Sequence, residues 1–208
     1  MAIAQSVREW RTDVVLEGET VRLEPLRREH EAAFWDVAKD SAEDIFLWIS
    51  YRMTTAEDFH RFVETAFLEQ ERRESLVFAT VERSAGRVIG STRFMNIDFK
   101  HRRAEIGSTW IAPPWQRSAV NTEAKYLMLR HAFENWGCLR VELKTDALNQ
   151  KSRNAILRIG AKQEGTLRKH MVTWTGRVRD DVYFSILDDE WPAVKANLEA
   201  KLKPRKAD

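Results

Sequence analysis

The residues with the clearest capacity for chemistry are Glu105 and the turn 116–122. Glu105 lies in an apolar, strand-like run, eleven residues before Gln116. A glutamate that faces a cleft can accept a proton, directly or through water. The turn leads into a helix, whose first amides lack intrahelical partners and carry partial positive charge, so it suits a phosphate group. These two features are therefore the candidates for proton transfer and for phosphate binding.

Each feature also has an ordinary structural explanation. Glu105 could instead form an ion pair with Arg102, Arg103 or Arg140. The turn could be a plain connection between a strand and a helix, because it lacks the glycines that usually let a backbone approach a phosphate. From the residue types alone, both explanations stay open.

Hydrophobic periodicity predicts the elements that position these residues. Pro113 and Pro114 end the strand that carries Glu105, since proline donates no ladder hydrogen bond. The strand–helix–strand unit over 104–145 implies a parallel pair with a right-handed crossover, and hairpins elsewhere imply a mixed sheet. Strands are expected at about 20–25, 76–82, 88–98, 104–112, 139–144, 162–174 and 178–187. Helices are expected at about 29–38, 55–71, 121–136 and 149–159, with a last helix from about 189.

Several of these segments resemble one family. The run Gln116-Arg117-Ser118-Ala119-Val120-Asn121 resembles the Gln/Arg-x-x-Gly-x-Gly/Ala motif with which the GNAT superfamily of N-acetyltransferases binds acetyl-CoA, with Ala119 and Asn121 in place of its glycines. Asn121-Thr122-Glu123 resembles the RimJ/RimL-type branch. The run Asn149-Gln150-Lys151-Ser152, with Gly160 farther on, resembles the Asn-x-x-Ser helix of the family. The opening 18–26 and the closing 165–187 also look like this branch.

The resemblance implies an α/β (α+β) fold, with a mixed, mostly antiparallel central sheet of about seven strands flanked by helices. Two central parallel strands would splay into a V that holds acetyl-CoA. The resemblance covers 14–198, between an N-terminal extension, 1–13, and a basic C-terminal tail, 199–208. Ala119 is compatible with this site if its φ is helical. The implied cofactor-binding residues are Thr109, Trp110, Ile111, Gln116, Arg117, Ser118, Ala119, Val120, Asn121, Thr122, Asn149 and Ser152.

The implied reaction is acetyl transfer to a primary amine by direct attack in a ternary complex. Glu105 is the candidate base, because Ala104-Glu105-Ile106-Gly107 resembles the catalytic-glutamate strand of the family. Ser152 is the candidate acid for the departing thiolate, with helix capping as its structural alternative. Tyr183 is a second candidate acid. About 15% of an α-amine but only about 0.04% of a lysine is free base at pH 7, which favours a protein or peptide N-terminus, or a small amine.

Composition narrows the remaining classes. The chain has 208 residues and a net charge of +2, which argues against nucleic acid and membrane surfaces as partners. Cys138 is the single cysteine, so no intrachain disulfide can form and a cytoplasmic location is expected. The histidines show no metal-binding spacing, so no metal is expected. A non-catalytic GNAT-fold module that binds acyl-CoA or a protein remains the alternative, and a homodimer stays open.

Overall fold

The computed structural model describes residues 11–203, and the rest of the expected N-terminal extension and basic tail lies outside the described residues. The strands are β1 (Leu16–Glu17), β2 (Val21–Pro25), β3 (Ser75–Glu82), β4 (Arg87–Asp98), β5 (Arg103–Ile111), β6 (Arg140–Asp146), β7 (Lys162–Val172) and β8 (Val178–Leu187). The α-helices are α1 (His30–Ala38), α2 (Ala42–Phe46), α3 (Ala56–Glu71), α4 (Val120–Arg130), α5 (Gln150–Arg158) and α6 (Trp191–Leu202).

The strands form one sheet in the order β1-β2-β3-β4-β5-β6-β8-β7. Every pair is antiparallel except β5 and β6, which are parallel and joined through α4. The mixed, mostly antiparallel sheet is therefore confirmed. It has eight strands rather than about seven, because β1 contains two residues and is too short to show a hydrophobic alternation.

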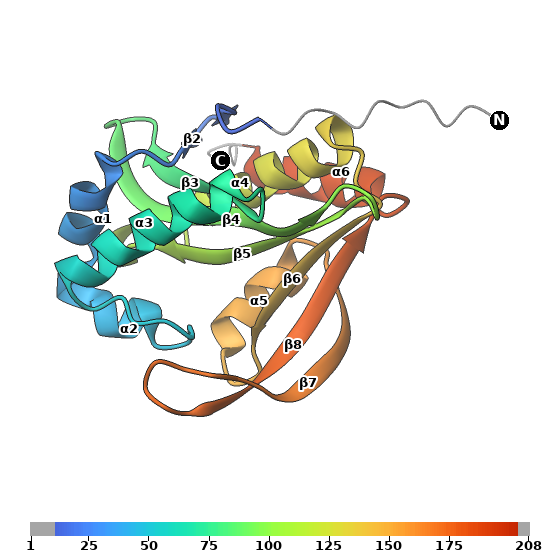
Figure 1. Ribbon diagram of the computed structural model, residues 1–208. Coiled ribbons are helices and arrows are strands. Elements are labelled where there is room, and N and C mark those ends of the chain that lie inside the picture. Colours follow the sequence, from blue (N-terminus) through green and yellow to red (C-terminus); the bar gives the residue numbers. More distant parts are fainter. Residues whose placement is uncertain (1–10, 204–208) are drawn as a thin grey trace, which may run out of the picture.

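The two parallel strands separate soon after they meet. β5 and β6 pair only from Arg103 with Arg140 to Glu105 with Glu142, although both strands continue beyond this point. A bulge follows on β5, where Ser108 has a φ of 46° and three steps of β5 face two of β4. A bulge bends its strand and increases the local twist. Figure 1 shows β6 and β8 running away from β5, which confirms the expected splay.

The sheet carries a hydrophobic core on each face. One core includes Ala104 and Ile106 of β5 together with side chains of α4, α5 and α6. The other includes Trp110 of β5 and side chains of α1, α2 and α3. Helices on both faces hold β5 at the centre of the molecule (Figure 1). The strand β5 that forms one side of the fork therefore contributes side chains to both cores.

Two helical segments differ from the predicted pattern. The helix expected to reach Trp136 ends at Arg130 and continues as a π-helical turn, His131–Asn135. The three-and-four spacing of apolar residues does not distinguish a single π-turn from an α-helix. The short helix α2 follows a 3-10 turn, Lys39–Ser41, and neither was expected. In the described part of the chain, no helix has the length and apolar character needed to span a membrane.

Candidate active site

The turn before α4 takes a shape that accommodates both glycine replacements. Ala119 is the N-cap of α4, with φ −67° and ψ −20°, which is a right-handed helical conformation open to any residue. The left-handed position of the turn is Arg117, with a φ of 60°. The expectation of a helical φ at Ala119 is therefore confirmed. The methyl group of Ala119 does not force a strained backbone at this point.

The N-terminus of α4 has amides available to a ligand. The Val120 amide donates to the Ser118 hydroxyl at 3.3 Å, and that hydroxyl donates to the Trp115 carbonyl at 2.6 Å. No described group accepts a hydrogen bond from the amides of Ala119, Asn121 or Thr122. Such free amides and the helix dipole together favour an anion.

Gln116 has a structural part in this turn. Its side-chain amide donates to the Ile111 carbonyl at 2.8 Å, which ties the turn to the end of β5. Arg117, Ser118 and Ala119 are exposed, whereas Val120 and Thr122 are buried at the start of the helix. The predicted loop residues are thus brought together around one helix end.

One edge of β5 faces the splay. Trp110 and Ile111 pair with Ser91 and Gly90 of β4, and no strand of the described residues pairs with this part of β5 on its other side. The Trp110 side chain is buried among aromatic rings, 5.6 Å from the ring of Phe34. The backbone of the predicted segment Thr109, Trp110 and Ile111 is therefore what the splay can offer to a ligand.

Glu105 is buried at the point where the parallel strands part, with 2% of its surface exposed. Its Oε2 accepts a hydrogen bond from the Asn96 amide at 2.8 Å. The Lys144 ammonium lies 3.3 Å from Oε1, and Oε1 accepts no hydrogen bond from any described residue. The structure thus gives Glu105 an ion pair with Lys144, and not with Arg102, Arg103 or Arg140.

The structure explains why a glycine stands at position 107, two residues after Glu105. A Cβ at Gly107 would lie 2.6 Å from the Met95 sulfur and 3.3 Å from Glu105 Oε1. Any larger residue would push against the carboxylate and its neighbour. The glycine therefore keeps the space around Glu105 free.

Glu105 faces a cavity of about 700 Å³. The cavity is lined by Asn96, Ile97, Asp98, Phe99, Arg103, Glu105, Glu142, Leu167 and Tyr183. Trp35, Trp48 and Trp174 are not among its lining residues. A buried carboxylate at the floor of an open cavity can exchange a proton with a bound molecule.

The start of α5 separates the roles of Asn149 and Ser152. Asn149 is the N-cap, and its side-chain oxygen accepts a hydrogen bond from the Ser152 amide at 3.0 Å. The Ser152 hydroxyl is partly buried and bonds to no described residue, so capping does not explain it. Tyr183, the other candidate acid, lines the cavity, and burial raises the pKa of its hydroxyl.

Arg158 joins the two helices at the site. It lies in the last turn of α5 and donates to the Thr122 hydroxyl at 3.2 Å, in the first turn of α4. Its guanidinium therefore adds a positive charge beside the free amides of α4. Nothing in the sequence distinguishes Arg158 from other exposed arginines, because the contact joins residues 36 positions apart.

Lys125 of α4 is a buried lysine whose ammonium reaches β5. Its ammonium donates to the Thr109 hydroxyl at 2.6 Å and lies 3.4 Å from the Thr92 hydroxyl, with no described carboxylate paired to it. Burial lowers the pKa of Lys125 from 10.5 to about 7. The lysine is therefore close to its midpoint near neutral pH, a state that the sequence does not reveal.

Glu123 links α4 to the first hairpin of the sheet. Its carboxylate accepts hydrogen bonds from the amides of Glu19, Thr20 and Val21, at 2.7–2.8 Å. A Cβ at Gly18 would lie 2.4 Å from this carboxylate. The opening Gly-Glu-Thr-Val run and the Asn-Thr-Glu run after the loop are therefore two sides of one contact.

Replacing Glu123 by alanine is expected to lower the free energy of unfolding by about 3–5 kcal/mol, because three amides near the core lose a charged acceptor. Urea denaturation at neutral pH measures this loss. Glu71→Ala, at an exposed helical position, is the matched control and should change stability little. Equal effects of the two substitutions would contradict the anchoring role of Glu123.

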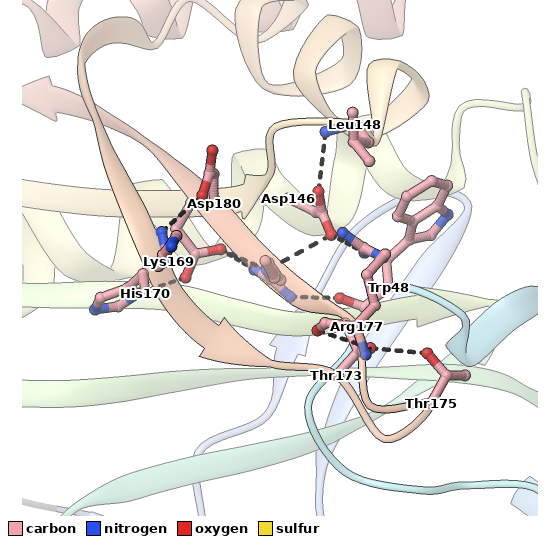
Figure 2. Close-up of polar contacts among 11 residues, drawn as sticks. Trp48, Asp146, Leu148, Lys169, His170, Thr173, Thr175, Arg177 and Asp180 are labelled. Carbon is pink, nitrogen blue, oxygen red and sulfur yellow. Dashed lines mark hydrogen bonds and ion pairs between the residues drawn. The ribbon is translucent and has the colours of Figure 1, made fainter.

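A charge network joins the β7–β8 hairpin to β6 and to the segment before α3 (Figure 2). Arg177 donates to the Asp146 carboxylate at the end of β6, and Asp146 also accepts from the Leu148 amide at 2.9 Å. Arg179 donates to the Trp48 carbonyl between α2 and α3. Asp181 accepts a hydrogen bond from Arg179 and lies 2.6 Å from His170. These hydrogen bonds attach the β7–β8 hairpin to the segment before α3.

Other candidate groups take no part in this arrangement. Burial raises the pKa of the Cys138 thiol to about 11, which disfavours a nucleophilic thiolate. Across residues 11–203, no group of three or more histidine, cysteine, aspartate or glutamate side chains could hold a metal ion.

Comparison with known proteins identifies the family. The family model described as the acetyltransferase (GNAT) domain matches residues 20–162. A GCN5-related N-acetyltransferase from Brucella melitensis has 33% sequence identity and a TM-score of 0.88, covering 99% of this chain and 92% of that chain. Mycobacterium smegmatis RimJ, solved in complex with CoA-disulfide, shares the fold at 22% identity, with a TM-score of 0.76 over 87% of this chain and 88% of its own.

A curated relative from Bacillus subtilis (strain 168) is YdaF, whose name gives ribosomal N-acetyltransferase as an unverified assignment. It is 34% identical over 110 residues, or 53% of this chain. The aligned part spans 59% of the length of YdaF, and the same share of a second curated relative, YoaA of the same organism. The match to the domain model covers well over half of the chain. The chain belongs to the GNAT acetyltransferase family, as its RimJ/RimL-type motifs had indicated.

Proposed function

We propose that this protein transfers an acetyl group from acetyl-CoA to a primary amine by direct attack in a ternary complex. The observation that carries the proposal is the position of Glu105. It is buried where β5 and β6 part, and the same strand β5 leads through the splay to the free amides of α4. One strand thus connects a candidate base to a candidate phosphate site.

The residues around the splay fit acetyl-CoA as the acetyl donor. The amides of Ala119, Asn121 and Thr122, with the Arg158 guanidinium beside them, would hold the pyrophosphate. The unpaired edge of Thr109–Ile111 would offer backbone hydrogen bonds to the pantetheine arm. The helical φ of Ala119 supports this assignment, because the loop does not depend on the missing glycines. Acetyl-CoA supplies the thioester that is the acetyl source.

Glu105 would act on the acceptor amine. The amine must be neutral to attack, and most of an α-amine is protonated at pH 7. Glu105 takes the proton, directly or through a water. The nitrogen then bonds to the carbonyl carbon of the thioester, and the carbon–sulfur bond breaks.

The departing thiolate needs a proton, and Ser152 is the proposed donor. Its hydroxyl is free of any capping bond, since Asn149 caps α5. Tyr183 is the second candidate, and it lies on the cavity side of the site. The pH dependence of kcat separates them: the variant that loses turnover mainly at high pH, Ser152→Ala or Tyr183→Phe, identifies the acid.

Release of free thiol from acetyl-CoA in the presence of an amine tests the proposed function. Amine-dependent thiol release, together with an acetylated amine seen by mass spectrometry, is the expected result. Acetyl-CoA with no amine is the control for hydrolysis. Binding of acetyl-CoA without turnover of any α-amine, alkyl amine or peptide N-terminus would instead make the chain a non-catalytic acyl-CoA-binding module.

A further inference from the structure

The cavity beside Glu105 extends the proposed function to the acceptor. We propose that this cavity binds the acceptor, and that it selects a primary amine that carries one apolar substituent and no carboxylate next to the amine. The proposal rests on the proposed function, since Glu105 at the cavity floor is the proposed base. The selectivity follows from the other lining residues, which belong to β4 and the turn after it, β5, β6, β7 and β8.

One part of the cavity wall is apolar. Ile97 and Phe99 come from the end of β4 and the turn after it, and Leu167 comes from the outer strand β7. Leu167 is 48% exposed. The ring of Tyr183 completes this wall and lies 5.9 Å from the His170 ring. A hydrocarbon or aromatic substituent would bury these surfaces.

The other part of the wall is negatively charged. Asp98, Glu105 and Glu142 line the cavity, whereas Arg103 is the one cationic lining residue among those described. Arg103 lies 3.6 Å from Asp98 and 3.8 Å from Glu142. An ammonium group is attracted to this excess of carboxylates before Glu105 removes its proton. A carboxylate beside the amine would be repelled by the same groups.

The charge balance also limits the number of positive charges on the acceptor. Lys144 stands beside Glu105, and Arg140 donates to Glu142 at 2.7 Å. Lys144 and Arg140 are not themselves among the lining residues, so carboxylates still outnumber cations at the cavity wall. A second or third ammonium on the acceptor would meet these cations, so a polyamine gains little from the cavity. The fit is to a single positive charge.

Two kinds of molecule carry a single primary amine, one apolar substituent and no carboxylate next to the amine. One is a small arylalkyl or alkyl amine. The other is the N-terminal residue of a peptide with an apolar side chain, because its own carboxyl group is converted into an amide. A free amino acid has the same amine and the same side chain but keeps the carboxylate, and the proposal excludes it.

Three acceptors test the selectivity. Phenethylamine, phenylalanine and a short peptide amide with N-terminal phenylalanine share the ring and the amine. We expect kcat/KM to be at least about tenfold higher for phenethylamine than for phenylalanine, because only the latter brings a carboxylate to the cavity. The greater basicity of an alkyl amine acts against this preference, so ionisation cannot create it. A higher kcat/KM for phenethylamine than for the peptide identifies the acceptor as a small amine, and the reverse order identifies it as a peptide N-terminus.

A matched pair of variants locates the selectivity in the cavity. Leu167→Lys places a cation at the cavity wall, whereas Val172→Lys places one on the same strand, 57% exposed and outside the cavity lining. We expect Leu167→Lys to raise KM for phenethylamine about tenfold with KM for acetyl-CoA unchanged, and Val172→Lys to change neither. Equal KM values for phenethylamine in the two variants would overturn the proposal.

Equilibrium binding keeps this proposal separate from the proposed function. Calorimetric titration with phenethylamine and with phenylalanine, without acetyl-CoA, needs no turnover. Selective binding that Leu167→Lys weakens supports the cavity even if no amine is acetylated, and the proposed function alone would then fail. Equal binding of the two compounds, or binding of neither at millimolar concentration, would overturn the cavity proposal whatever the turnover.

Discussion

Replacing Glu105 by glutamine is expected to lower kcat/KM for the amine by about two to four orders of magnitude, while the Kd of acetyl-CoA stays the same. The range is that of a positioned general base. Glutamine keeps the shape of the side chain and an oxygen that can accept the hydrogen bond from Asn96. It removes the negative charge that faces Lys144 and the ability to take a proton.

The same variant separates a base from a purely structural glutamate. If Glu105 removes the proton, the loss of activity in Glu105→Gln should be smaller for the acceptor amine that has the larger neutral fraction. Steady-state kinetics with one α-amine and one more basic alkyl amine measure the difference. A uniform loss for both amines, accompanied by a lower melting temperature, would assign Glu105 a structural role. Unchanged kcat/KM would remove it from the mechanism.

Replacing Lys125 by methionine is expected to stabilise the protein at pH 7 by about 2–4 kcal/mol. A fall of the lysine pKa from 10.5 to about 7 on folding corresponds to about 4–5 kcal/mol of unfavourable burial. Methionine fills similar space without a charge. The hydroxyls of Thr92 and Thr109 retain each other as partners, at 2.7 Å.

The pH dependence of stability gives the sign of this effect. Between about pH 7 and pH 10.5 the unfolded chain holds a proton on Lys125 that the folded chain lacks, so the free energy of unfolding rises with pH across this window. Urea denaturation of Lys125→Met should therefore show a gain over the wild type that shrinks from pH 7 to pH 9. Lys100→Met, at an exposed position, is the control. Parallel pH profiles for Lys125→Met and the wild type would contradict a neutral buried lysine.

Local patterns in the sequence were sufficient for most of the fold. Strand patterns in the sequence placed β3 to β8 within a few residues, because each of these strands is 7 to 12 residues long. The strand–helix–strand unit predicted the one parallel pair, and the resemblance implied the splay. β1 and α2 were missed because two and five residues carry too little periodicity.

The partners of the site residues could not be read in the same way. The sequence offered three arginines as possible ion-pair partners of Glu105. The structure instead pairs Glu105 with Lys144, which is 39 positions away in the sequence. The register of β5 with β6 creates that pair, and hydrophobic patterns do not fix register between separate strands. The burial of Lys125 and the position of Arg158 arise in the same way from helix packing. The sequence does not show whether Asn149 or Ser152 caps α5, so it could not predict that the Ser152 hydroxyl is left without a capping bond.

Thermal unfolding with and without acetyl-CoA tests most directly whether the glycine-poor loop forms a cofactor site. At about one hundred times Kd the ligand adds about 2.7 kcal/mol, which raises the melting temperature by about 5–10 °C in a chain of this size. Ala119→Asp should lose this rise, because a carboxylate at the exposed N-cap repels phosphate, and the neutral Ala119→Asn should keep it. No rise in the wild-type protein would contradict the acetyl-CoA site.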